Sequence, residues 1–171
     1  PKLIKGPDAL IEVARILKGR VNELNFLLTG PARGHVKAGL ARIGVPVTHV
    51  IQKDYTDIAE NYYAVDAYVV TSREEGGPRA ILESMATGVP IISTRVGQAA
   101  DLITHGANGW LSDVGDVEAL AHWTEVALES DYSSSSVSSL ARSTAEKNSW
   151  IAQTELWQNF FDGIVEKGNV N

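Results

Sequence analysis

The sequence predicts an α/β fold of the Rossmann-like kind, a three-layer α/β/α sandwich built on a parallel sheet. Short apolar runs of strand length alternate along the chain with segments whose apolar residues recur at helical spacing. The apolar runs are continuous, as expected for strands that are buried on both faces. Strands that alternate with helices pair in parallel, and the helices cover both faces of the sheet. The 171 residues suffice for one hydrophobic core, so we predict a single domain over 1–171.

The predicted strands are short runs rich in apolar and β-branched residues. The clearest, LNFLLT, ends at Gly30-Pro31, and another, VPIIS, carries Pro90 only near its start, where a strand tolerates proline. The predicted strands cover residues 24–29, 47–51, 67–71, 89–93 and 110–111.

The predicted helices begin at a proline or a capping residue, and several end at a glycine. Pro7 and Pro78 suit a first helical turn, Asp116 is a plausible cap, and Gly19 and Gly88 terminate helices. The predicted helices cover residues 7–19, 33–43, 54–64, 79–87, 98–104, 116–128, 141–148 and 150–167.

The carboxyl-terminal part, about 141–171, is predicted to hold the last helices, after a serine-rich polar loop or capping turn at 131–139. In the last helix, large apolar side chains recur at roughly helical spacing. They are Trp150, Trp157, Phe160, Phe161 and Ile164. We interpret such a stripe first as core packing. The alternative is a surface that packs against another domain.

Composition excludes several classes of function. A net charge of −6 argues against nucleic acid as a partner, and no apolar run is long enough to span a membrane. The chain has no cysteine, and its four histidines are scattered, so we expect neither a metal site nor disulfides. We expect a cytoplasmic protein, with peripheral attachment of the intact protein to a membrane as an open alternative.

The start of the chain is unusual. The sequence begins with Pro1, and its one methionine is Met85. Because translation starts at methionine, we expect either a processed chain or a piece of a longer one.

The segment 67–97 carries the clearest chemical signal. Its first strand leads into a loop with Gly76 and Gly77, where the backbone can bend sharply and a ligand can approach closely. A helix follows, and its first amides have no helical partner and favour an anion. Glu75 in the loop and Glu83 one turn into the helix can reach the same crevice. Carboxylates accept hydrogen bonds from sugar hydroxyls, so the pattern predicts a ligand that joins a sugar to a phosphate.

Basic residues gather near the same predicted edge. Arg33, Arg73 and Arg95 each follow a predicted parallel strand, and Lys5 and Arg79 lie near helix starts. Open α/β sheets bind ligands at the carboxyl ends of their strands. We therefore expect these cations to face an anionic ligand, although charged residues also favour loops in general.

The motif Glu75-GGPRAIL-Glu83-SMATGVPIIST resembles the hallmark of one family, in which two glutamates are separated by seven residues. The family is the glycosyl transferases group 1, retaining enzymes with the two-domain GT-B architecture, and the resemblance is to their carboxyl-terminal, donor-binding half. Lys5-Gly6, the segment 27–30 (LLTG) and the segment 106–111 (GANGWL) also resemble parts of this domain. The resemblance covers about residues 2–165.

The resemblance implies roles for the residues of the central motif. Glu83 would hold the ribose hydroxyls of a nucleotide, and Glu75 would contact the transferred sugar as a catalytic residue. Amides around Gly76, Gly77, Arg79 and Ala80 would contact the sugar and the diphosphate.

Residues outside the motif receive roles by the same resemblance. Lys5 would neutralise the diphosphate leaving group. Gly30 would let the backbone approach the donor, and Ile51 and Gln52 would hold the base.

The sequence departs from the family pattern in three places. Many members have an aromatic residue and then glycine where this chain has Gly77 and Pro78, and proline removes one amide. Asp101 stands where glutamate is frequent. The family's phosphate-binding arginine would fall upstream of Pro1, so the predicted phosphate site is incomplete.

The resemblance implies an enzyme that transfers a sugar from a nucleotide-diphosphate sugar to an acceptor with retention of configuration. It implies no cofactor and no metal, and it implies an amino-terminal acceptor-binding domain that this chain lacks. The chain alone would then be inactive or weakly active.

Other functions stay open at this point. One alternative is a nucleotide-sugar epimerase or hydrolase of the same plan, and another is a non-catalytic nucleotide-binding module. A dinucleotide-binding domain is disfavoured because no Gly-x-Gly-x-x-Gly follows a strand, and a receiver domain because no early strand ends in an acidic cluster.

Overall fold

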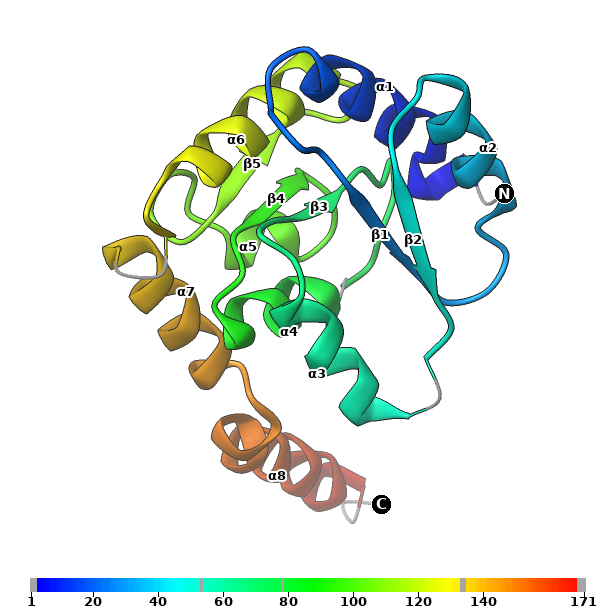
Figure 1. Ribbon diagram of the computed structural model, residues 1–171. Coiled ribbons are helices and arrows are strands. Elements are labelled where there is room, and N and C mark those ends of the chain that lie inside the picture. Colours follow the sequence, from blue (N-terminus) through cyan, green and yellow to red (C-terminus); the bar gives the residue numbers. More distant parts are fainter. Residues whose placement is uncertain (1–2, 53, 78, 133–134, 169–171) are drawn as a thin grey trace.

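The computed structural model describes residues 3–52, 54–77, 79–132 and 135–168, and it has the predicted α/β architecture with parallel strands (Figure 1). The described strands form two sheets, ordered β1-β2 and β3-β4-β5. They pair in register, Phe26 with Val47, Tyr68 with Ile91 and Ile92 with Trp110. The strands are β1 (Phe26–Thr29), β2 (Val47–Val50), β3 (Tyr68–Val70), β4 (Ile91–Thr94) and β5 (Trp110–Ser112).

Helices connect the strands, as the alternating pattern predicts. A short 3₁₀ turn, Leu3–Lys5, precedes the first of them. The helices are α1 (Pro7–Lys18), α2 (Gly34–Arg42), α3 (Tyr55–Tyr63), α4 (Arg79–Thr87), α5 (Ala99–Leu102), α6 (Val117–Glu129), α7 (Ser136–Lys147) and α8 (Trp150–Gly168).

Successive residues of β4 face opposite layers of helices. Ile91 packs in a cluster with Ile81 and Met85 of α4 and with Ala141 of α7. Its neighbour Ile92 packs on the other side, against side chains of α1 and α6. Because side chains alternate along a strand, these two clusters confirm the three layers.

Helix α1 packs against both sheets. Val13 and Leu17 join the cluster under β4 and β5, whereas Ala14 joins a third cluster with Leu28 of β1 and Leu40 of α2. Helix α1 also packs against both α2 and α6. The start of α1 is therefore fixed relative to both groups of strands.

Two sequence predictions near the carboxyl end were wrong. Helix α7 begins at Ser136 and not at 141, because a capping turn forms within the serine-rich stretch 131–139. The Ser135 hydroxyl accepts a hydrogen bond from the Ser138 amide at 3.3 Å and caps the helix. The aromatic stripe of α8 is not core. The Trp150 side chain is 83% exposed and Trp157 is 48% exposed.

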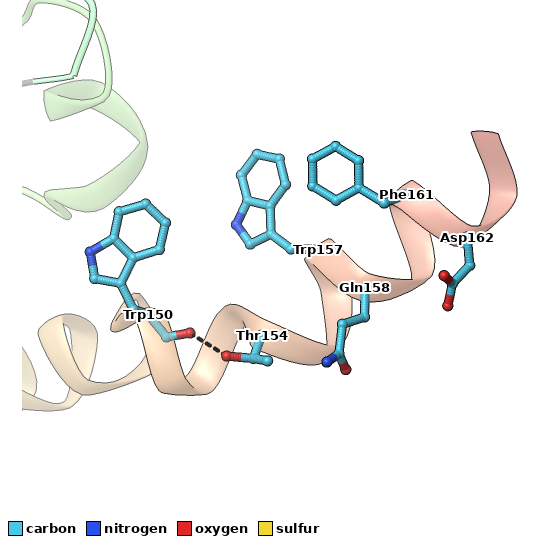
Figure 2. Close-up of a pocket in the computed structure, with 6 residues that line it drawn as sticks. All are labelled: Trp150, Thr154, Trp157, Gln158, Phe161 and Asp162. Atoms are coloured by element: carbon cyan, nitrogen blue, oxygen red, sulfur yellow. Dashed lines mark hydrogen bonds between the residues drawn. The ribbon is translucent and has the colours of Figure 1, made fainter. Parts of the chain in front are cut away.

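Helix α8 lies at the end of the fold and packs against α7 (Figure 1). Trp150, Trp157 and Phe161 project from the same side of this helix and line a groove of about 610 Å³ (Figure 2). Phe160 and Ile164 are also more than half exposed. The described part of the chain leaves this apolar face open.

The turn before α1 is docked on the end of β3. Gly6 has φ +59°, and a Cβ atom there would lie 2.0 Å from the Thr71 carbonyl oxygen. The Thr71 hydroxyl hydrogen-bonds the Lys5 and Gly6 carbonyl oxygens at 3.1 and 3.0 Å, and the Arg73 amide donates to the Ile4 carbonyl at 2.7 Å. Only glycine fits this close approach.

We predict that Gly6→Ala lowers the free energy of unfolding by about 2–4 kcal/mol, because it adds backbone strain and a clash with Thr71. Urea unfolding measures this change. Gly34→Ala is the control, because a Cβ atom at Gly34 meets nothing within 4 Å. Equal stabilities of the two variants would contradict the docking.

Candidate functional site

The docking of the turn before α1 brings two predicted site residues together. The Lys5 ammonium forms an ion pair with the Glu75 carboxylate, although the two residues are 70 positions apart. The Ser72 hydroxyl donates to the same carboxylate oxygen at 3.1 Å. The Glu75 side chain is 16% exposed, whereas Lys5 is 51% exposed. Glu75 is thus held in place, and Lys5 can turn toward a ligand.

The loop after β4 supports the glycine-rich loop after β3. Gly97 has φ +47°, and a Cβ atom there would lie 2.3 Å from the carbonyl oxygens of both Glu75 and Gly76. The backbone amide of Gln98 donates to the Gly76 carbonyl at 3.1 Å, and the Thr94 hydroxyl donates to the Ser72 carbonyl at 2.6 Å. These contacts fix the path of the backbone that carries Glu75.

The second glutamate, Glu83, is held from helix α3. The buried Tyr62 hydroxyl donates to the Glu83 carboxylate oxygen Oε2 at 3.0 Å and lies 3.3 Å from the Ala80 carbonyl oxygen. Burial raises the pKa of the Tyr62 phenol, and Tyr68 and Glu83 raise it further. Tyr62 therefore stays protonated and able to donate over the range in which proteins are usually studied.

Helix α4 begins at Arg79, between the two glutamates in sequence. The amides of Arg79 and Ala80 belong to its first turn, where backbone N–H groups have no partner within the helix. Such amides and the helix dipole favour an anion. Pro78, predicted as the first helical residue, lies outside the described residues.

The three arginines predicted near the ligand already have protein partners. Arg73 lies 2.9 Å from an Asp8 carboxylate oxygen, and this bond holds the pKa of Asp8 below its usual value. Arg95 lies 3.7 Å from Asp113, and Arg33 donates to the Thr29 carbonyl at 2.7 Å. Arg73 thus fastens the start of α1, and donor binding by these arginines stays a prediction.

The residues predicted to hold a base lie at the carboxyl end of the β1-β2 sheet. Gly30 has φ +78° and donates its amide to the Val50 carbonyl at 3.0 Å. The His49 ring nitrogen Nε2 forms a 2.8 Å hydrogen bond with the Gly30 carbonyl. Ile51 is exposed and Gln52 is half-buried. Their contact with a nucleotide stays a prediction.

Sequence reasoning missed the side chains that support the site. It gave no role to Tyr62, whose hydroxyl bonds to Glu83, nor to Ser72, Gly97 or Gln98. Of these residues, only Gly97 had a signal in the sequence that could have identified it. It follows β4 closely, and ligands bind at the carboxyl ends of parallel strands.

The family model described as "Glycosyl transferases group 1" matches residues 2–144. The chain belongs to the glycosyl transferases group 1 family. It is 30% identical over 128 residues to the amylovoran biosynthesis glycosyltransferase AmsK of Erwinia amylovora, covering 68% of this chain and 31% of AmsK. It is 30% identical over 125 residues to the lipopolysaccharide core biosynthesis mannosyltransferase LpsB of Rhizobium meliloti, covering 36% of LpsB. The chain thus spans about a third of these group 1 relatives.

Solved structures of glycosyltransferases share the fold. A glycosyltransferase from Rickettsia africae superposes with a TM-score of 0.82 at 23% identity, over 95% of this chain and 45% of the other. Anabaena HepE, solved in complex with UDP, gives a TM-score of 0.79 at 21% identity, over 94% of this chain and 46% of HepE. The carboxyl-terminal domain of LpcC from Francisella tularensis gives a TM-score of 0.74 at 18% identity, over 86% of this chain and 81% of the other. The group 1 chain therefore has the Rossmann-like fold of one half of a GT-B enzyme.

Two further properties bear on the group 1 domain. No helix among the described residues is both long enough and apolar enough to cross a membrane. The same residues place no three His, Asp or Glu side chains together as metal ligands, and the absence of a metal requirement stays a prediction.

We predict that Gly97→Ala lowers the free energy of unfolding by about 2 kcal/mol and shifts the loop after β3, because its methyl group meets two carbonyl oxygens. Urea unfolding and the amide resonances of Glu75 and Gly76 report the two effects. Gly34→Ala is the control, since a Cβ atom there meets nothing within 4 Å and both reporter amides stay unaltered. A Gly97→Ala variant that unfolds like wild type would show that the loops do not support each other.

Proposed function

We propose that this chain is the donor-binding domain of a glycosyltransferase that takes a sugar from a nucleotide-diphosphate sugar and transfers it with retention of configuration. The observation that carries the proposal is the Lys5–Glu75 pair beside a glycine-rich loop and the first turn of α4. It combines a carboxylate for sugar hydroxyls, a cation for a diphosphate and free amides for either one. HepE, which has the same fold, was solved with UDP, and this favours a nucleotide donor here.

The proposed reaction needs charge stabilisation at the leaving group. The bond between the anomeric carbon and the diphosphate oxygen breaks, and the nucleoside diphosphate leaves with the electron pair. An acceptor hydroxyl oxygen bonds to the same carbon, and its proton passes to the leaving phosphate. Lys5 and the amides of Arg79 and Ala80 would stabilise the negative charge that develops on the diphosphate.

The Lys5–Glu75 pair would rearrange when donor binds. Lys5 is half exposed, so its ammonium can turn from Glu75 toward a diphosphate without leaving water. Glu75 would keep its hydrogen bond from Ser72 and present its carboxylate to the sugar. In the absence of ligand, the pair keeps the two charges compensated.

A second, amino-terminal domain would supply the acceptor site in this proposal. The chain spans about a third of its curated relatives, and α8 carries an uncovered face of large apolar side chains. Burying such a face against a domain of the intact protein removes apolar surface from water. The composition favours a cytoplasmic setting for this enzyme.

An epimerase or hydrolase of the same plan would use a similar donor site. The curated group 1 relatives are named as glycosyltransferases, which favours transfer to an acceptor. A product assay on the intact protein separates the three reactions, and a chain that binds donor without any product would be a non-catalytic module.

We predict that Glu75→Ala and Glu83→Ala each weaken donor binding by about tenfold, since each removes an acceptor of hydrogen bonds from hydroxyls. Calorimetric titration of the 171-residue chain with UDP-, GDP- and ADP-glucose measures the affinities. Glu118→Ala on α6 is the control, because its exposed carboxylate pairs with Arg20. Wild-type affinity in both site variants would refute the site, and no binding of any donor by wild type would refute the proposed function.

We predict that the amides of α8 exchange with solvent faster in the 171-residue chain than in the intact protein, because a second domain covers the aromatic face there. Hydrogen exchange with mass spectrometry measures both proteins. Helix α6 serves as the internal control, because Leu120 and Ala121 are already fully buried. Equal exchange of α8 in the two proteins would argue against this packing.

A further inference from the structure

We propose that Tyr62 is a positioning residue, which orients the Glu83 carboxylate so that its remaining lone pairs bind the ribose hydroxyls of the donor. The inference rests on the proposed function and adds a residue from a different helix to its site. Tyr62 lies on α3, 21 positions before Glu83, and its side chain is only 6% exposed.

The Tyr62 hydroxyl has one proton and, besides the neighbouring Tyr68 hydroxyl, two acceptors on α4 within reach. The Glu83 oxygen Oε2 is at 3.0 Å and the Ala80 carbonyl oxygen at 3.3 Å. The closer acceptor is also the charged one, and hydrogen bonds to ionised groups are the stronger ones. The proton therefore goes to Glu83.

The ring of Tyr62 is itself held firmly. It packs against the Tyr68 ring of β3, with ring centroids 5.1 Å apart, and α3 packs against α4. A donor mounted on a buried ring has little rotamer freedom, so the carboxylate that accepts from it also loses freedom. Tyr62 thereby pre-orients Glu83 before a ligand arrives.

The hydrogen bond uses only one side of the carboxylate. Among the described residues, Tyr62 is the donor that contacts Glu83, and it contacts Oε2. With respect to the described residues, the other oxygen, Oε1, and the remaining lone pair of Oε2 are available to two neighbouring hydroxyls. A carboxylate with this arrangement suits the 2′- and 3′-hydroxyls of a ribose.

A protein without the Tyr62 hydroxyl would still fold, but its preference for ligands with ribose hydroxyls over ligands without them would be smaller. Tyr62→Phe keeps the ring against Tyr68 and removes only the donor. Glu83 could then rotate, and its bonds to the ribose hydroxyls would weaken, whereas contacts to base and phosphate would stay. The loss is therefore specific to ligands that carry the hydroxyls.

The test compares two ligands on three proteins. Calorimetry first identifies which of UDP, GDP and ADP the wild-type 171-residue chain binds most tightly. The same nucleoside diphosphate and its 2′,3′-dideoxy analogue are then titrated into wild type, Tyr62→Phe and Tyr63→Phe. Tyr63 is the matched control, because it is the next residue of α3 and is 73% exposed. Thermal unfolding verifies that each variant is folded.

We expect Tyr62→Phe to lower the affinity for the ribose form by about fivefold, as for the loss of one ordinary hydrogen bond, and to leave the dideoxy form unchanged. Tyr63→Phe should match wild type for both ligands. Adding Glu83→Gln to Tyr62→Phe should reduce the remaining preference for ribose without weakening the dideoxy form.

Other outcomes overturn the inference. An unchanged ratio of ribose to dideoxy affinity in Tyr62→Phe, or an equal loss for both ligands, would show that Tyr62 is only structural. A wild-type chain that binds a nucleotide but shows no ribose preference would also overturn it. No binding of any nucleotide by wild type would instead refute the proposed function on which the inference rests.

Discussion

The docking of the turn before α1 on the end of β3 is the contact on which the rest of the site depends. At Gly6 the backbone comes so close to the Thr71 carbonyl that a side chain has no room. The Thr71 hydroxyl and the Arg73 amide then bond to carbonyls of the same turn. This contact sets Lys5 against Glu75, and it fixes α1, which packs under both groups of strands.

A second layer of support comes from the loop after β4. Gly97 lets that loop lie against the carbonyls of Glu75 and Gly76, and Thr94 bonds to the carbonyl of Ser72. The glycine-rich loop is therefore held by neighbours rather than free to adapt. A rigid loop loses little conformational freedom when a ligand binds, which favours affinity.

The charges of the site are compensated within the protein. Lys5 pairs with Glu75, Arg73 with Asp8 and Arg95 with Asp113. An acidic chain can thus present several cations at one sheet edge without leaving them unpaired. In the proposed function, a diphosphate would draw Lys5 away from Glu75, whereas the pair at Arg73 continues to fasten α1.

Local sequence determined most of the secondary structure. Continuous apolar runs specified buried parallel strands, and the glycine-rich loop followed by Pro78 predicted a helix start between Glu75 and Glu83. Helix α7 began earlier than expected, because the capping by Ser135 is one of several equivalent choices in a serine-rich stretch. The spacing of the apolar residues in α8 predicted the helix correctly, but spacing alone does not determine whether that face is buried or exposed.

Only the tertiary structure decided which distant residues meet. The sequence marks Lys5, Tyr62, Ser72 and Gly97 as separate positions, and their partners lie from 3 to 70 positions away. Periodicity and turn signals report the local conformation of the backbone, whereas these contacts depend on how α1, α3 and the two loops pack around the strands. The sequence therefore determined which chemical groups are available at the sheet edge. The packing of helices and loops decided which of these groups contact and orient one another.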